Sequence, residues 1–406
     1  MHKPIGVLVA ATFFLGLTAC APPRPGAAAA PLLSADITPV PTASAAVTPS
    51  PIAPTFVQAS PTAEPTAQIP ELQDGAIRSQ IDKLASWFVD QGTDPGLSVS
   101  VVMRNPQTGQ LEEMLLSYGR SSKDKGQPIT PDTIYEIGSI TKVFTGILLG
   151  EAVNSGAMKL SDPIQMYLPP GIQAPAYNDV QITLLDLATH RSGLPRDLDS
   201  DGIADMYAWL NSLHISRLPG SEYSYSNAGY SLLGDMLARQ AGTDYGSLEY
   251  TAVSRPLGLS DTTEALNTVQ ASRLAQGYTY DGSPADDFPQ SGAMSGAGYL
   301  HSTLADMTRF LVENMQPDAT PLGRPIDMTE SLQAGGRNPG TGVGLGWEID
   351  GLGTARERLY KGGATRAFTS YISFTRDGRA GFVLLANGMF VENLVPHMLN
   401  ILGMNQ

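Results

Sequence analysis

Residues 135–146 read Tyr-Glu-Ile-Gly-Ser-Ile-Thr-Lys-Val-Phe-Thr-Gly, and in this stretch we predict that an extended segment turns into a helix. Ser139 and Lys142 are three residues apart, so they share one helix face and their side chains can meet. A serine beside an amine pairs a nucleophile with a base. Backbone N–H groups at a helix start can also stabilise a developing oxyanion. Because Ser-x-x-Lys pairs also occur on ordinary helix surfaces, the interpretation depends on the accompanying motifs.

Two further short motifs carry groups suited to acyl transfer. The first is Tyr225-Ser226-Asn227, in which the phenol can move a proton if cations lower its pKa, and the amide can both donate and accept hydrogen bonds. The second is Lys361-Gly362-Gly363, in which lysine supplies positive charge and the glycines let a substrate backbone approach a strand. Each motif alone is equally typical of a surface loop or strand.

The hydrophobic pattern places strands near both ends of the folded part. A helix pattern over 76–91 precedes two strand patterns, and a helix pattern over 391–402 follows three more. The segment between them is mostly helical in pattern. We therefore predict an α+β fold, in which an antiparallel sheet flanked by helices is built from both termini and an all-helical lobe is inserted. The predicted strands are 96–104, 111–118, 357–361, 368–374 and 380–386.

The N-terminus has the pattern of an export signal. Lys3 precedes an apolar run, Ile5 to Leu17, which is shorter than the roughly 20 residues of a membrane-spanning helix. The run ends in Leu-Thr-Ala-Cys at residues 17–20, which resembles the lipobox of bacterial lipoproteins, where the cysteine is lipidated. We predict a signal peptide over 1–19 and lipidation at Cys20, the chain's only cysteine. The alternative is an ordinary secretory signal with a chance cysteine.

A linker and a single catalytic domain are expected after the signal. Residues 21–70 hold 12 of the 31 prolines with Ala, Thr and Ser between them, a composition that cannot bury a core. We predict a lipid-anchored, disordered linker over 20–73 and a folded domain over 74–406. The protein would then be exported and attached to a bacterial membrane, with its catalytic domain on the extracytoplasmic side.

Taken together and in this order, the three motifs resemble those of the serine β-lactamase and penicillin-binding-protein superfamily. The similarity is greatest to the branch of class C β-lactamases, D-Ala-D-Ala carboxypeptidases and related esterases, which carries Tyr-x-Asn. The resemblance covers roughly residues 75 to 402 and implies a β-lactamase/transpeptidase-like fold with the active site between the sheet and the helical lobe. Further stretches that support it are 184–195, 219–220, 256–259, 296–303 and 344–347.

The resemblance also implies a role for each motif residue. Ser139 would be the acyl-enzyme nucleophile, and Lys142 and Tyr225 would share proton transfer. Asn227 would bind the substrate amide, while Lys361 would hold its neighbours in their reactive states by its charge.

The third motif departs from the usual Lys-Thr-Gly or Lys-Ser-Gly of this family, because Gly362 carries no hydroxyl to bind a substrate carboxylate. Thr365 or Arg366 would have to replace that hydroxyl, and a guanidinium can bind a carboxylate through two hydrogen bonds. Gly363 would let substrate lie close to the strand, and the N–H groups of Ser139 and Ala364 would form the oxyanion hole.

Other classes of protein fit the sequence poorly. The formal net charge is −14 and no Lys/Arg-rich run occurs, so nucleic acid is not an expected partner. The five histidines form no metal-ligand spacing such as H-E-x-x-H, and no nucleotide-binding fingerprint or G-x-S-x-G elbow occurs. We therefore expect no metal and no cofactor.

The expected function is that of a serine hydrolase acting through an acyl-enzyme on D-Ala-D-Ala-type peptidoglycan peptides or β-lactams. Two alternatives stay open. One is an esterase for small esters, and the other is a catalytically silent envelope protein that binds penicillin or peptidoglycan. Sustained turnover separates the alternatives, because a silent binder stops after at most one equivalent.

Overall fold

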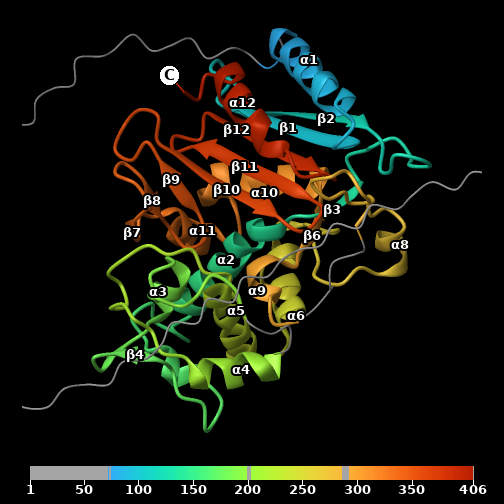
Figure 1. Cartoon of the computed structure of the whole chain (residues 1–406). Helices are drawn as coiled ribbons and strands as arrows, with labels where there is room; N and C mark the ends of the chain where they lie inside the picture. The colour runs from blue at the N-terminus through green and yellow to red at the C-terminus, as the bar shows by residue number, and fades with distance from the viewer. Residues whose placement is uncertain (1–71, 73–74, 199–202, 286–291, 406) are drawn as a thin grey trace, which may run out of the picture. The chain divides into compact units, whose positions relative to one another are not determined.

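The computed structural model describes residue 72 and residues 75–198, 203–285 and 292–405 (Figure 1). The predicted signal peptide over 1–19, the lipidation site Cys20 and almost all of the predicted linker over 20–73 lie outside the described residues. Among the described residues, no helix combines the length and the apolar character that crossing a membrane requires.

An eight-stranded sheet joins segments from both ends of the chain, and every neighbouring pair in it is antiparallel. Its strand order is β2-β1-β12-β11-β10-β9-β8-β7. The alignment of Leu97 with Ala386 in the β1–β12 pair places a strand from the beginning of the folded domain beside one from its end. The α+β fold class predicted from the sequence is confirmed. The strands are β1 (Gly96–Arg104), β2 (Leu111–Gly119), β7 (Ala334–Gly335), β8 (Gly342–Val343), β9 (Glu348–Asp350), β10 (Arg358–Ala364), β11 (Thr369–Thr375) and β12 (Ala380–Ala386).

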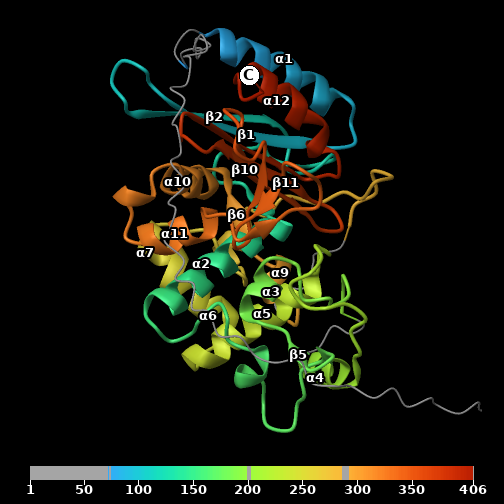
Figure 2. The ribbon, with the colours of Figure 1, turned by 90° about the vertical axis from the view of Figure 1, so that its left-hand side faces the viewer.

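Helices cover both faces of the sheet. On one face, α1 (Ala76–Asp90) and α12 (Val395–Ile401) lie side by side and form a core cluster with alternate residues of β1 and β12 (Figures 1 and 2). On the other face, α10 (Leu304–Met315) packs against β1, β2, β11 and β12. Because side chains alternate between faces along a strand, each central strand contributes to both cores.

The helical region lies between β2 and β7 in the chain. Its central helix, α2 (Thr141–Asn154), is buried on all sides over its first ten residues, as expected for a helix without a polar face. Gly146 lets α2 approach residue 345 closely, because a Cβ there would lie 2.0 Å from the Leu345 carbonyl oxygen. The other helices are α3 (Leu184–Ala188), α4 (Ile203–Ser212), α5 (Asn227–Ala241), α6 (Tyr245–Glu249), α7 (Arg255–Leu257), α8 (Thr268–Ala271), α9 (Ser295–Gly298) and α11 (Gly323–Glu330).

A short two-stranded sheet leads the chain into the residues around Ser139. In it, β3 (Ile134–Glu136) pairs with β6 (His301–Thr303). A second two-stranded sheet joins β4 (Ala176–Tyr177) to β5 (Val180–Gln181).

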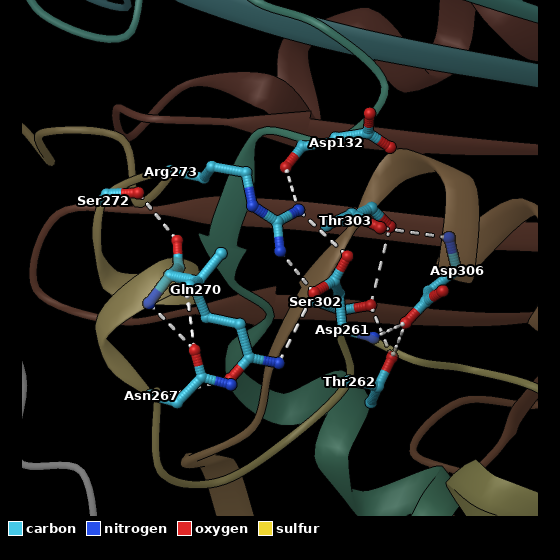
Figure 3. A network of polar contacts seen from close by, with 11 residues as sticks. Asp132, Asp261, Thr262, Asn267, Gln270, Ser272, Arg273, Ser302, Thr303 and Asp306 are labelled. Atoms are coloured by element: carbon cyan, nitrogen blue, oxygen red, sulfur yellow. Dashed lines mark hydrogen bonds and ion pairs between the residues drawn. The ribbon is translucent and has the colours of Figure 1, made fainter.

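A polar network fixes the segments beside β3 and β6 (Figure 3). The Arg273 guanidinium donates to both carboxylate oxygens of Asp261, at 2.9 and 2.5 Å. Asp306 in turn accepts a hydrogen bond from the Asp261 backbone and another, at 2.9 Å, from the Thr262 hydroxyl. The Arg273 carbonyl accepts from the N–H of Ile134, the first residue of β3. The network therefore supports the strand that leads to the predicted nucleophile.

Candidate active site

Ser139 lies in a short 3₁₀ turn, Gly138–Ile140, that runs directly into α2. The Lys142 Nζ donates to the Ser139 Oγ at 3.0 Å, as the Ser-x-x-Lys spacing predicts. Gly138 has a φ of 50°, and a Cβ there would lie 2.6 Å from the Ala364 backbone nitrogen. This close approach sets the serine turn against the end of β10, which is the arrangement that the predicted oxyanion hole requires.

Tyr225 reaches the same serine from the start of α5. Its hydroxyl donates to the Ser139 Oγ at 2.8 Å. The next residue, Ser226, caps α5 by accepting from the Gly229 N–H, and its own N–H donates to the Nδ1 of His190. The His190 ring lies 4.3 Å from the Tyr225 ring, centroid to centroid. Helix capping and ring packing thus fix the direction of the phenol.

Lys142 is fully buried among neutral acceptors. Besides Ser139, its Nζ donates to the Asn227 Oδ1 at 2.8 Å and to the Ala297 carbonyl oxygen at 2.6 Å. Burial lowers the pKa of Lys142 to about 8; Tyr225 opposes this shift and the charge of Lys361 adds to it. An amine with that pKa is partly unprotonated near neutral pH and can act as a base.

Tyr225 lies between two lysines. Its ring centroid is 5.0 Å from the Lys142 Nζ and 5.0 Å from the Lys361 Nζ. Burial alone would raise the pKa of Tyr225, but the charges of Lys142 and Lys361 outweigh it and bring the pKa to about 8. The phenol and the Lys142 amine therefore titrate as a coupled pair, and either can take the Ser139 proton.

Lys361 lies on β10, is also fully buried, and has an acidic partner. Its Nζ lies 3.0 Å from the Glu348 Oε1. Burial disfavours the ammonium, but the charges of Tyr225 and Glu348 outweigh it and raise the pKa of Lys361 above its ordinary value. Burial alone would raise the pKa of Glu348, but the attraction to Lys361 outweighs burial, and the pKa of Glu348 is lowered. The ion pair with Glu348 and the raised pKa both favour the charged form of Lys361.

Two cavities meet at Ser139. The larger, of about 460 Å³, includes Gly363 and Ala364 in its lining, and the smaller, of about 250 Å³, includes Thr365 and Arg366. Asn227 lines both cavities. The structure therefore places every predicted site residue of the folded domain in or directly beside one cleft.

Two of these residues are already engaged in the free protein. The Asn227 amide donates to the Asp197 carboxylate at 2.7 Å while its oxygen accepts from Lys142. The Thr365 hydroxyl oxygen accepts the backbone N–H groups of the next turn, from Ala367 and Phe368. Substrate would therefore have to share or displace the contacts of Asn227.

Several residues of the site were not identified from the sequence. Glu348, His190, Arg196 and Asp197 contact the predicted groups, yet they lie outside the three motifs, His190, Arg196 and Asp197 in one segment and Glu348 in another. Glu348 directly follows the Gly-Leu-Gly-Trp stretch at 344–347, which was the one available signal for it. The φ of 58° at His190 and the packing of its ring on Tyr225 indicate a supporting role for this residue.

The described residues contain no group of three or more His, Cys, Asp or Glu side chains that could hold a metal ion. The chemistry that these residues offer is instead that of an activated serine. Ser139 has two possible proton acceptors at hydrogen-bond distance, and a fixed cation lies behind them.

Comparisons with known proteins agree with this arrangement. The family model described as Beta-lactamase matches residues 81–398. A beta-lactamase of Pseudomonas fluorescens is 31% identical over 71% of this chain and 79% of its own length. The D-alanyl-D-alanine-carboxypeptidase/endopeptidase AmpH of Escherichia coli (strain K12) is 31% identical over 62% of this chain and 66% of its own length. A beta-lactamase of the same strain is 28% identical over 77% of this chain and 89% of its own length. With its Ser139, Lys142 and Tyr225 brought together in the cleft, this chain belongs to the beta-lactamase family.

Proposed function

We propose that the protein is a serine hydrolase that acts through an acyl-enzyme on D-Ala-D-Ala-type peptides or β-lactams. The observation that carries the proposal is the pair of hydrogen bonds that converge on the Ser139 Oγ, at 3.0 Å from Lys142 and 2.8 Å from Tyr225. A nucleophile with two bases of pKa about 8 is suited to attack a carbonyl carbon near neutral pH.

The reaction has two halves. The Ser139 oxygen forms a bond to the substrate carbonyl carbon while its proton passes to the coupled Tyr225–Lys142 pair. The negative charge on the carbonyl oxygen is held by the N–H groups of Ser139 and Ala364, and the leaving group departs with the proton. Water then attacks the ester, with the same pair removing its proton, and releases the acid and free Ser139.

Covalent labelling tests this proposal. A fluorophosphonate probe or a fluorescent penicillin should label the folded domain, with the adduct located on Ser139 by peptide mass spectrometry. Ser139→Ala should abolish labelling and leave the thermal unfolding midpoint within a few degrees. Labelling that persists in Ser139→Ala contradicts the proposal. One equivalent of label without turnover of any substrate would instead favour the silent-binder alternative.

The neighbourhood of Gly362 favours the esterase alternative within the same chemistry. No hydroxyl projects from this position of β10, so the strand offers no side-chain donor for a substrate carboxylate there. Small esters need no such donor. Turnover of p-nitrophenyl acetate, compared with that of a D-Ala-D-Ala peptide, measures the balance between the two activities.

We further propose that the mature protein begins at a lipidated Cys20 and is held outside the cytoplasm by that anchor. The apolar run over 5–17, followed by the lipobox-like residues 17–20, supports this proposal. Mass spectrometry of the protein purified from membranes should find an acylated N-terminal cysteine. An unmodified N-terminus downstream of Cys20 would exclude lipidation without excluding export.

A further inference from the structure

An acidic side chain occupies the space beside Gly362. Along β10, Gly362 faces away from Lys361, because successive strand residues alternate between faces. A Cβ at Gly362 would lie 3.3 Å from the Glu392 Oε1 and 3.7 Å from the Tyr371 ring. Glu392 itself lies in the short 3₁₀ helix Val391–Leu394, which follows β12. A carboxylate therefore lies where a longer side chain at position 362 would reach.

Glu392 belongs to the cleft that holds the nucleophile. Its exposed side chain lines the 460 Å³ cavity together with Ser139, Gly362 and Tyr371. A substrate bound at Ser139 in this cavity would therefore bring one of its ends close to Glu392.

The other charged groups that line this cavity contact side chains away from Gly362 or are paired. Arg196 and Arg337 both line the cavity, Arg196 over the Tyr225 ring and Arg337 over the Tyr223 ring. Glu348 is paired with Lys361, which faces the opposite side of β10 from Gly362. Arg358 reaches the Tyr371 hydroxyl, but its charge is balanced by Asp350 at 2.7 Å. Among the described residues, Glu392 therefore supplies the one charged group within 4 Å of a Cβ at Gly362.

We propose that Glu392 makes this part of the cleft a subsite for a neutral or cationic leaving group and selects against a carboxylate there. The inference rests on the acyl-enzyme function proposed above and narrows its substrate class. A carboxylate placed beside Glu392 would meet a like charge, which is unfavourable at a contact. A cation would meet the opposite charge of the Glu392 carboxylate. The expected order of preference is cationic, then neutral, then anionic.

Arg366 offers a separate place for a carboxylate. It lines the 250 Å³ cavity with Thr365, and that cavity does not include Glu392 in its lining. A carboxylate-bearing substrate that reacts well by using Arg366 would therefore respond to Arg366→Ala and not to changes at Glu392. The two residues can be tested independently with one set of substrates.

Three thioesters of the same acyl group provide the test. Hippuryl esters of thioglycolate, of methyl thioglycolate and of thiocholine carry an anionic, a neutral and a cationic leaving group. With each, the Ser139 oxygen replaces sulfur at the carbonyl carbon, the thiol leaves with the serine proton, and water then releases hippurate. All three form the same hippuryl-enzyme. Because the three thiols differ in intrinsic leaving ability, the ratio of kcat/KM between a variant and the unmodified protein, taken for each ester, reports the leaving-group subsite. Thiol release is followed with a disulfide reagent.

The matched variant is Glu392→Gln, which keeps the size of the side chain and removes its charge. We expect it to raise kcat/KM for the thioglycolate ester about fivefold and to lower kcat/KM for the thiocholine ester by a similar factor. An effect of this size is typical of an exposed charge pair. The value for the neutral ester should stay unchanged. Glu113→Gln removes an exposed carboxylate on β2 and should change none of the three. Because Glu392 is exposed, its effect should shrink in 0.5 M salt.

The outcomes separate the two proposals. If the thioglycolate is the best substrate of the unmodified protein and Glu392→Gln leaves all three values unchanged, the subsite proposal is overturned. A selective loss of thioglycolate hydrolysis in Arg366→Ala, without an effect of Glu392→Gln, overturns it too and assigns carboxylate binding to the other cavity. If no thioester is turned over and none adds the hippuryl mass to the intact protein, the acyl-enzyme function fails, and the subsite proposal fails with it.

Discussion

The two lysines of the cleft are alike in burial and differ in charge behaviour. Lys142 and Lys361 are both fully buried, and each Nζ lies 5.0 Å from the centre of the Tyr225 ring. Yet the pKa of Lys142 falls to about 8, while that of Lys361 rises. The difference comes from their other partners, because Lys142 contacts neutral oxygens and Lys361 has the carboxylate of Glu348.

This difference shows how one cleft supplies both a base and a fixed cation. Burial alone pushes any lysine towards its neutral form. On α2 nothing but Tyr225 opposes that push strongly, so the Lys142 amine can accept a proton. On β10 the charges of Tyr225 and Glu348 together reverse it, and Lys361 retains the charge that lowers the pKa of Tyr225. The groups that contact each lysine amine, more than the burial of the side chain, determine whether the lysine serves as a base or as a fixed cation.

Removing the base should have the largest effect. Lys142→Ala and Tyr225→Phe should each lower kcat/KM by roughly 10²–10⁴-fold, the range for a lost acid–base group. Steady-state assays with a neutral ester measure this effect, and thermal unfolding of Tyr225→Phe controls for structure, since that change removes only a hydroxyl. Near-normal turnover by Tyr225→Phe would exclude the phenol from proton transfer and leave Lys142 as the base.

Removing the fixed cation should move the pH profile. In the unmodified protein, the protonated Lys142–Tyr225 pair cannot accept the Ser139 proton, so kcat/KM should rise with pH through an apparent pKa near 8. Lys361→Gln removes a charge that lowers the pKa of Tyr225, so the rising limb should move to higher pH. A shift of one pH unit corresponds to about tenfold lower kcat/KM at neutral pH.

The direction of this shift is the decisive readout. Loss of activity without any displacement of the limb would mean that Lys361 binds substrate and does not tune the bases. A displacement to lower pH would contradict the electrostatic role that its position 5.0 Å from the Tyr225 ring indicates.

Removing the carboxylate from the ion pair should cost stability. In Glu348→Gln, the Lys361 ammonium stays buried without its counter-ion, which destabilises the fold by about 1–3 kcal/mol. The pKa of Lys361 should fall, so the stability loss of the variant relative to the unmodified protein should grow as the pH is lowered from the alkaline range, where that lysine is neutral in the variant, to neutral pH, where it must be protonated. Urea unfolding at several pH values measures both effects. Equal stability losses at every pH would show that the pair does not control the charge of Lys361.

The sequence predicted five of the eight strands of the sheet, and the short strands β7, β8 and β9 were not predicted. Strands β1 and β12 are rich in apolar and β-branched residues. Their predicted bounds, 96–104 and 380–386, coincide with the observed ones. The spacing of Ser139 and Lys142 is a local property of a helical turn, so it could be read directly.

Contacts between distant segments could not be read in this way. Glu348 meets Lys361 across neighbouring strands, and Glu392 approaches Gly362 only because the chain after β12 folds back over the sheet. No periodicity in the sequence fixes either distance. The predicted helix over 391–402 also divides into a 3₁₀ helix and α12, with Glu392 in the first part. Long-range charge pairs are therefore where the structure adds most to the sequence.

The smallest effect should come from Asp197, which contacts Lys142 only through Asn227. Asp197 accepts from the Asn227 amide at 2.7 Å, and this bond orients the amide oxygen towards Lys142. Because the Asp197 carboxylate is exposed, Asp197→Ala should lower kcat/KM by no more than about fivefold. Asn227→Ala, which removes the neutral acceptor itself, should have a clearly larger effect. If Asp197→Ala were as damaging as Asn227→Ala, the Asp197 charge would have to act on Lys142 directly, and the contrast between a lysine with neutral partners and one with an acidic partner would no longer hold.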